Sequence, residues 1–203
     1  MTDQPADGQT YIDEDFSDRT FAQARWERIT FERCDFSDAD LHGLSTKNCR
    51  FLECKIVRVD ASESRHTASA FHNCSFERSN FIHSRFDGCS LLGSTFLECR
   101  LRTWSIRDSD LTLVSLSRAD LRKCTLAGLR LREANLTGTD LRETDLSRAD
   151  LTGARLREAL LGDADLRGAR IDANGLVQAN LRGARVDIDT AIAFAAAHGL
   201  VID

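Results

Sequence analysis

The seven cysteines are the residues of this sequence that could most readily do chemistry. Cys34, Cys54 and Cys74 recur every twenty residues, a spacing that would bring their thiols within disulfide reach in a stacked coil. No Cys-x-x-Cys pair is present, which gives little support to a zinc site. The sequence also predicts a cytoplasmic location, where thiols stay reduced. We therefore expect an interior ladder of free thiols that fills small spaces in the core.

His66 is the second candidate for chemistry, because it occupies a position that is otherwise large and apolar. It could be a functional site, although a tolerated irregularity of the core is the preferred interpretation. No Ser/His/Asp or Cys/His set and no Gly-rich phosphate loop accompanies it, and the many carboxylates are scattered. The sequence therefore predicts a protein that is not an enzyme and has no catalytic residue, no cofactor and no metal.

A five-residue repeat must position all of these residues. From Tyr11 to Val186 every fifth residue is large and apolar or aromatic, apart from Thr46, Ala61 and His66, and this column holds all but one of the eleven Phe. Two residues before each large residue lies a column of small residues, which contains every Cys and later mostly Ala. Neither a helical nor a simple strand period produces such a pattern.

The repeat predicts an all-β fold, a right-handed quadrilateral β-helix in which each group of five forms one side. Four sides make a coil of twenty residues, and about eight to nine coils stacked at the sheet spacing give a rod roughly 40 Å long. Trp104 stands in the small column, so we expect a local distortion there. The unbroken register excludes an inserted loop between residues 11 and 186. Residues twenty apart should stack, as Phe31, Phe51 and Phe71 in one set and Phe16, Phe36, Ile56, Phe76 and Phe96 in another.

Three segments are expected along the chain: a flexible acidic N-terminus over 1–10, the β-helix over 11–187, and a C-terminal helix and tail over 188–203. Asp189 is the expected N-cap of the helix and Gly199 its stop. The helix could simply cap the last coil, but its apolar surface favours a two-fold dimer contact. The dimerisation residues are predicted to be Ile188, Ile192, Phe194, Ala195, Ala196, Leu200 and Val201.

The net charge of −5 argues against direct nucleic-acid binding, which needs clustered Lys and Arg. No apolar run is long enough to cross a membrane and the N-terminus is not a secretory signal, so a cytoplasmic protein without a membrane partner is expected. The charges are nevertheless uneven. Acids outnumber bases in residues 1–45, whereas bases predominate in residues 46–107 and on the side of the coil that contains residues 26, 46 and 66.

Three stretches carry a closer resemblance, namely Ser69 to Arg78, Leu92 to Arg102 and the tail from Gly183 to Leu200. They resemble the MfpA and Qnr group of pentapeptide-repeat proteins, which is associated with fluoroquinolone resistance. The resemblance implies a homodimeric, DNA-mimicking rod that binds DNA gyrase in place of duplex DNA, modulates or inhibits its supercoiling and protects it from fluoroquinolones. The alternative is a structural or scaffolding solenoid that binds an unrelated protein partner.

If the protein mimics DNA, outward carboxylates should replace phosphates against a basic groove. The residue before each large one points outward in the predicted coil. The candidate phosphate mimics are the aspartates at this position on two sides of the coil, namely Asp40, Asp60, Asp120 and Asp140 on one side and Asp110 and Asp150 on another.

Overall fold

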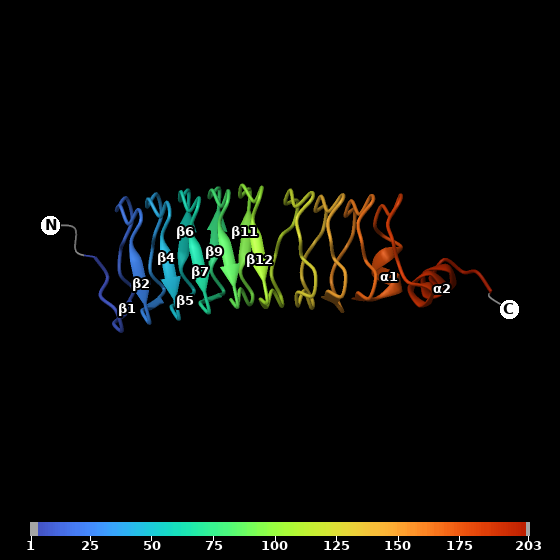
Figure 1. The fold of residues 1–203 in the computed structure, drawn as a ribbon, viewed down its shortest axis with the longest axis horizontal. Helices are drawn as coiled ribbons and strands as arrows, with labels where there is room; N and C mark the ends of the chain where they lie inside the picture. Colours follow the sequence, from blue (N-terminus) through green and yellow to red (C-terminus); the bar gives the residue numbers. More distant parts are fainter. Residues whose placement is uncertain (1–3, 202–203) are drawn as a thin grey trace. The chain divides into compact units, whose positions relative to one another are not determined.

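The protein is described by a computed structural model over residues 4–201, in two compact units that divide after Asp110. The predicted fold class is confirmed, because the chain is a β-solenoid of about 8 turns with short C-terminal helices. Every paired residue in both units lies twenty positions from its partner along the chain. The predicted twenty-residue period is therefore the period of the coil (Figure 1).

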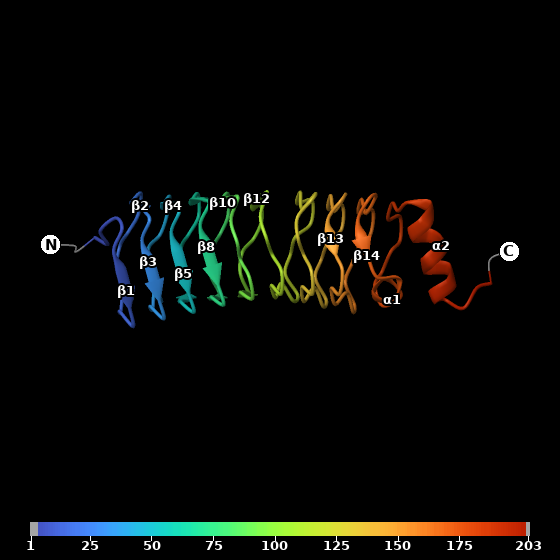
Figure 2. The same ribbon diagram turned by 90° about the horizontal axis from the view of Figure 1, so that it is seen from below.

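Three sides of the first unit carry short parallel strands, and the fourth is held by single bridges (Figures 1 and 2). We call side 1 the sheet β1-β3-β5-β8, side 2 the sheet β6-β9-β11, side 3 the bridged side with Asp40 and Asp60, and side 4 the sheet β2-β4-β7-β10-β12. The strands are β1 (Thr10–Ile12), β2 (Arg25–Glu27), β3 (Thr30–Glu32), β4 (Ser45–Lys47), β5 (Arg50–Leu52), β6 (Lys55–Val57), β7 (Arg65–Thr67), β8 (Ala70–His72), β9 (Ser75–Glu77), β10 (Arg85–Asp87), β11 (Thr95–Leu97) and β12 (Ser105–Arg107).

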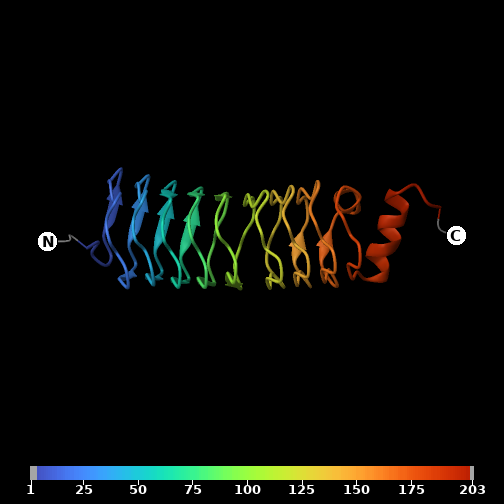
Figure 3. The same ribbon diagram turned by 90° about the horizontal axis from the view of Figure 1, so that it is seen from above.

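The second unit repeats the same coil with less strand. Only β13 (Asp150–Leu151) and β14 (Arg170–Ile171) form a named sheet, and the other sides are joined by isolated bridges such as Asp120 to Asp140. Two helices follow, α1 (Ala173–Leu176) and α2 (Ile188–Ala197), and α2 comes after the last coil (Figure 3). Among the residues that the structure describes, no helix is long and apolar enough to span a membrane.

Aromatic ladders fill the first unit, as the twenty-residue spacing predicts. The rings of Phe31 and Phe51 stack with centroids 4.9 Å apart, and those of Phe51 and Phe71 with centroids 4.7 Å apart. On side 2 the Phe76 and Phe96 rings stack at 4.4 Å. In the second unit the same column is filled by buried leucines. Because each coil covers the next, the core is continuous within each unit.

Two kinds of corner join the sides. In a closed corner the amide of the small-column residue donates to the carbonyl of the large residue three positions earlier, as Ala24 does to Phe21 over 3.0 Å. In an open corner the chain stays extended and this hydrogen bond is not formed. The side chain of the small residue one coil later bonds to the corner instead. Ser79 donates its hydroxyl to the Ile56 carbonyl over 2.9 Å and accepts the Val59 amide over 3.1 Å.

Trp104 does not produce the expected distortion within the first unit. Its indole is buried beside Phe86 and Phe96, with ring centroids 5.6 and 5.2 Å away. The pairing of β10 with β12 keeps its register, with Arg85 opposite Ser105. The coil accommodates Trp104 because Leu101 and Ile106, smaller than Phe, occupy the neighbouring large positions.

The described part of the N-terminal segment is hydrogen-bonded to the first coils. The carboxylate of Asp7 accepts the Glu27 amide over 2.8 Å, and the Gly8 amide donates to the Glu27 carbonyl over 3.1 Å. Residues 1–3 of the predicted flexible segment, and residues 202–203 of the predicted tail, lie outside the described residues.

The helices correct two expectations. The N-cap of α2 is Asp187, whereas Asp189 lies in the first helical turn, where its charge suits the helix dipole. Gly199 has the positive φ expected of a helix stop. The sequence did not predict α1, which replaces one corner without an insertion, because Leu176 still enters the core at its place in the five-residue register.

Candidate partner-binding surfaces

Six of the seven cysteines bring their thiol to a carbonyl of an open corner one coil earlier, and Cys124 is the exception. All seven are free thiols, and six of them are buried. The thiol sulfurs of Cys54 and Cys74 lie 3.5 and 3.3 Å from the carbonyl oxygens of Phe31 and Phe51, which belong to open corners one coil earlier. Burial raises the pKa of Cys89 and Cys99 to about 11, so these thiols stay protonated and weakly nucleophilic near neutral pH. The thiols at the open corners thus add a weak donor to backbone carbonyls.

His66 is a buried member of a polar network. Its Nδ1 lies 2.8 Å from the Thr46 hydroxyl and its Nε2 lies 3.0 Å from the Ser64 hydroxyl. Burial lowers the pKa of His66 to about 3, so the ring is neutral at physiological pH. Within the described residues no group of three or more His, Cys, Asp or Glu side chains could hold a metal ion. The core interpretation of His66 therefore agrees with its surroundings.

The aspartates before the large residues have a structural task in addition to their charge. One carboxylate oxygen accepts the amide two residues later, as between Asp15 and Ser17 over 2.9 Å and between Asp150 and Thr152 over 3.1 Å. This contact holds the carboxylate at the start of each side. It explains the preference for Asp and Asn at this position and leaves the second oxygen facing outward.

Asp40 and Asp60, two of the predicted phosphate mimics, are neighbours on side 3 of the first unit. Asp60 accepts hydrogen bonds of 3.0 Å from the Ser62 amide and from Asn80. Burial alone would raise the pKa of Asp60, but these hydrogen bonds outweigh it and hold the pKa below its usual value. Neither aspartate forms an ion pair within the described residues, so the two present uncompensated negative charge in adjacent coils.

The predicted mimics of the second unit have arginine partners. Asp120 lies 2.7 Å from Arg122, Asp140 lies 2.6 Å from Arg142, and Asp150 lies 3.5 Å from Arg132. The Arg142 guanidinium holds the pKa of Asp140 below its usual range. These pairs offset the field that the carboxylates would present to a partner.

Asp110, the sixth predicted mimic, is the last residue of the first unit. Its amide donates to the Cys89 carbonyl over 2.9 Å. The structure thus gathers Asp40 with Asp60 and Asp120 with Asp140, but does not bring the six together.

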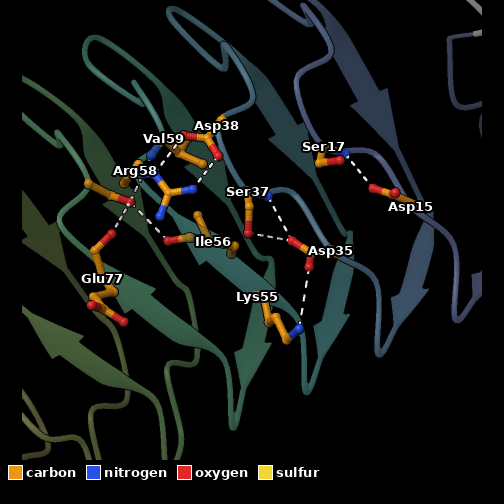
Figure 4. Close-up of polar contacts among 11 residues, drawn as sticks. Asp15, Ser17, Asp35, Ser37, Asp38, Lys55, Ile56, Arg58, Val59 and Glu77 are labelled. Atoms are coloured by element: carbon orange, nitrogen blue, oxygen red, sulfur yellow. Dashed lines mark hydrogen bonds and ion pairs between the residues drawn. The ribbon is translucent and has the colours of Figure 1, made fainter.

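A second acidic group lies on side 2 around β6 and β9 (Figure 4). Asp15 and Asp35 are bridge partners there, although they are not among the predicted mimics. Both stand before a large residue, which is the signal that could have found them. Asp35 lies 3.4 Å from Lys55, whereas Asp15 accepts a hydrogen bond from the Ser17 amide over 2.9 Å (Figure 4). The acidic surface of the first unit therefore extends from side 2 to side 3.

Several residues predicted for dimerisation expose apolar surface on and after α2. Ile188 is 77% exposed, Ile192 46% and Leu200 63%, with Val201 also exposed. Phe194 is half-buried, and its ring lies 4.5 Å from that of His198. Ala195 is half-buried and Ala196 exposed. These side chains form the largest group of exposed apolar residues near the C-terminus.

The repeat that builds these surfaces identifies the family. Pentapeptide repeats match the chain at residues 15–51, 69–103, 115–153 and 149–186. The chain belongs to the pentapeptide-repeat family. Over 92 residues it is 51% identical to the pentapeptide repeat protein MfpA of Mycobacterium tuberculosis, and over 58 residues it is 49% identical to MfpA of Mycolicibacterium smegmatis.

These sequence matches cover only part of each protein. The first covers 45% of this chain and 50% of its relative, and the second covers 29% and 30%. The chain therefore spans about half of the length of the first relative, and less of the second.

Solved structures match more of the pentapeptide-repeat chain. QnrB1, a plasmid-mediated fluoroquinolone resistance protein, has a TM-score of 0.82 at 21% identity, with 97% of this chain and 99% of that chain covered. HetL of Nostoc, a pentapeptide repeat protein involved in heterocyst differentiation regulation, has a TM-score of 0.55 at 19% identity. At these identities the likeness establishes the fold alone, which is the Qnr pentapeptide-repeat fold.

Proposed function

We propose that this protein binds DNA gyrase in place of a DNA duplex, modulates or inhibits supercoiling, and thereby protects the enzyme from fluoroquinolones. It acts by binding and catalyses no reaction. The observation that carries the proposal is the pair Asp40 and Asp60, two carboxylates in adjacent coils without a cation. The partial identity with two MfpA proteins and the fold shared with QnrB1 support the choice of partner.

The physical basis is electrostatic complementarity with a basic DNA groove. A backbone hydrogen bond fixes each carboxylate on side 3, with the His42 amide 3.0 Å from Asp40. Because the carboxylate is already ordered, little side-chain entropy is lost when it meets an arginine or lysine. The proposal therefore places the main contact on the first unit, where the charge is uncompensated.

The test compares two neutralised pairs in a gyrase supercoiling assay. Asp40→Asn/Asp60→Asn removes the charge but keeps the backbone contact, because Asn accepts the same amide, as Asn180 does from Arg182. We expect inhibition by this variant to require about tenfold more protein, equivalent to about 1.4 kcal/mol. Asp120→Asn/Asp140→Asn is the matched control on the equivalent side of the second unit, and should change inhibition by less than about threefold.

Three results would contradict the proposal. The parent protein could leave supercoiling unchanged, Asp40→Asn/Asp60→Asn could inhibit as well as the parent, or the control pair could have the larger effect. The first result would favour the second candidate, a scaffolding solenoid with an unrelated partner. That candidate is supported by the arginine pairing of Asp120, Asp140 and Asp150, which leaves the surface less negative than DNA.

We further propose that the protein acts as a homodimer through α2. The exposed side chains of Ile188 and Ile192 lie one turn apart and would be covered by a second copy related by a two-fold axis. In light scattering coupled to size exclusion, Ile188→Lys/Ile192→Lys should elute as a monomer. Leu113→Lys, which changes a 51% exposed leucine elsewhere in the second unit, should leave the dimer intact. A parent protein that is monomeric at micromolar concentration would exclude the proposal.

A further inference from the structure

A row of cations runs along side 4 of the first unit, which follows the acidic side 3 in each coil. Five successive coils each contribute one exposed arginine or lysine from β2, β4, β7, β10 and β12. We call this row the cationic ladder; its members are Arg25, Lys47, Arg65, Arg85 and Arg107. Since neighbouring coils lie about 4.8 Å apart, the ladder is roughly 19 Å long.

The ladder differs from most other cations of the first unit in having no carboxylate partner. Arg33, Arg58 and Arg78 each pair with an acid in an adjacent coil, Asp13, Asp38 and Glu98 respectively. No member of the ladder forms an ion pair within the described residues. Five guanidinium or ammonium groups thus keep their full capacity to bind an anion.

The ladder has two rows, and a depression that we call the channel lies between them at β10 and β12. Arg25, Arg65 and Arg85 begin their strands, whereas Lys47 and Arg107 end theirs. Arg65 and Arg85 are direct register partners in adjacent strands. Arg85 and Arg107 both line a depression of about 380 Å³, where Thr103 and Ser105 add hydroxyl groups. An extended chain that lies along the channel could meet cations on either side.

The dimensions favour a narrow polyanion. A three-residue strand is about 10 Å long, so side 4 is narrower than the major groove of a DNA duplex alone, which is about 12 Å wide. A duplex on side 4 would also come near the acids of side 3. The large residues of side 4, Trp26 and Phe86 among them, are buried, so no aromatic platform is present for the bases of a single strand.

We propose that the cationic ladder binds an extended, acidic peptide segment of a partner protein. In such a segment, side chains on the same face recur about every 6.7 Å. Arginine side chains are long enough to compensate for the difference between this spacing and the spacing of the coils. The strands of side 4 already pair with one another, so recognition comes from side-chain charge and not from strand addition. This surface is separate from the carboxylates of the proposed gyrase contact, and neither proposal depends on the other.

The probe is a fluorescein-labelled peptide of about twelve residues that alternates Glu and Ser, followed by fluorescence anisotropy at low salt. We expect Arg65→Glu/Arg85→Glu to weaken binding by at least about tenfold. Arg50→Glu/Arg100→Glu is the matched control, because both arginines are exposed, unpaired and outside side 4, and the change in net charge is the same. It should weaken binding by less than about threefold.

A third variant tests the ladder by strengthening it. Asp87 lies in register beside Arg107 and lines the channel, so Asp87→Asn should tighten binding by about twofold to fivefold. The proposal fails if the parent does not bind the peptide, or if both arginine pairs weaken binding equally, which would indicate net charge alone. It also fails if a duplex of about 20 base pairs competes more strongly than the unlabelled peptide.

Discussion

The two units use one twenty-residue coil but build it from different interiors. The first stacks phenylalanines and joins most of its sides by open corners, which extend into twelve short strands. The second stacks leucines and uses closed corners, which leave almost no strand. A closed corner satisfies its own carbonyl, whereas an open one needs a donor from the next coil. Strand content therefore depends on the chemistry of the small column as well as on the large residues.

The cysteines and serines of the first unit illustrate this dependence. Cys34, Cys49 and Cys89 each lie one coil after an open corner and approach the carbonyls of Tyr11, Trp26 and His66. Alanine, which predominates in the second unit, has no donor and follows closed corners, as at Ala159 and Ala164. In the first unit most polar small residues follow open corners, whereas Thr139 and Thr144 of the second unit donate to carbonyls of closed corners.

The largest difference between the interiors should appear when a ring is removed. Phe51 is 2% exposed and stacks with the rings on both sides, so Phe51→Ala should lower the free energy of unfolding by about 3–5 kcal/mol. Leu146→Ala, at a fully buried large position of the second unit, removes a smaller side chain and should cost about 2–4 kcal/mol. Guanidinium unfolding followed by circular dichroism measures both. An equal or larger loss in Leu146→Ala would contradict the comparison.

A buried ionisable residue in the large column also distinguishes the first unit. The pKa of His66 is about 3 when folded and about 6.5 when unfolded. Between these values only the unfolded chain binds the proton, so stability falls as the pH drops from 6.5 towards 3. The expected loss from His66 between pH 7 and pH 5 is about 2 kcal/mol.

The check on this pH dependence is the free energy of unfolding at pH 7 and pH 5 for the parent and for His66→Phe. Phe would continue the aromatic column beside Phe86, and the variant keeps every other titrating group. Its stability should fall by about 2 kcal/mol less than that of the parent over this range. The same loss in both proteins would show that His66 does not titrate as its burial implies.

A thiol at an open corner should matter more than one at a closed corner. Cys54→Ala leaves the Phe31 carbonyl without its side-chain donor and should cost about 1 kcal/mol. Cys54→Ser restores a donor and should stay within about 0.5 kcal/mol of the parent. Cys124→Ala is the control, because the Cys124 thiol donates to no backbone carbonyl within the described residues. The idea fails if Cys54→Ala costs no more than Cys124→Ala.

Much of this fold could be predicted from sequence because the five-residue register repeats without interruption. The stacks of Phe31 on Phe51 and Phe76 on Phe96 follow from counting by twenty. The open and closed corners could not be predicted in the same way, because a hydroxyl residue one coil later accompanies both kinds, as Ser79 and Thr139 show. Likewise, α1 does not interrupt the five-residue register, so the register could not predict this helix.

Less of the candidate surfaces than of the fold could be predicted from the sequence. Counting placed Asp40 beside Asp60 and Asp120 beside Asp140. It did not show that Asp120 and Asp140 form ion pairs with Arg122 and Arg142, because these contacts depend on the conformation of long side chains. The cationic ladder was visible only as an excess of bases on one side; the absence of ion pairs required the structure.

The smallest expected effect concerns a small residue of the first unit that stands in the column of large residues. Ala61 stands in the large column, where the second unit has Leu, Ile or Val throughout, and it borders a cavity of about 20 Å³ together with His66, Phe76 and Phe81. Ala61→Val should raise the free energy of unfolding by about 0.5 kcal/mol, at about 24 cal/mol per Å³ filled. Ala39→Val, at a buried small-column position, should instead destabilise through overpacking. A loss of stability in Ala61→Val would mean that the first unit has already relaxed around its missing side chain.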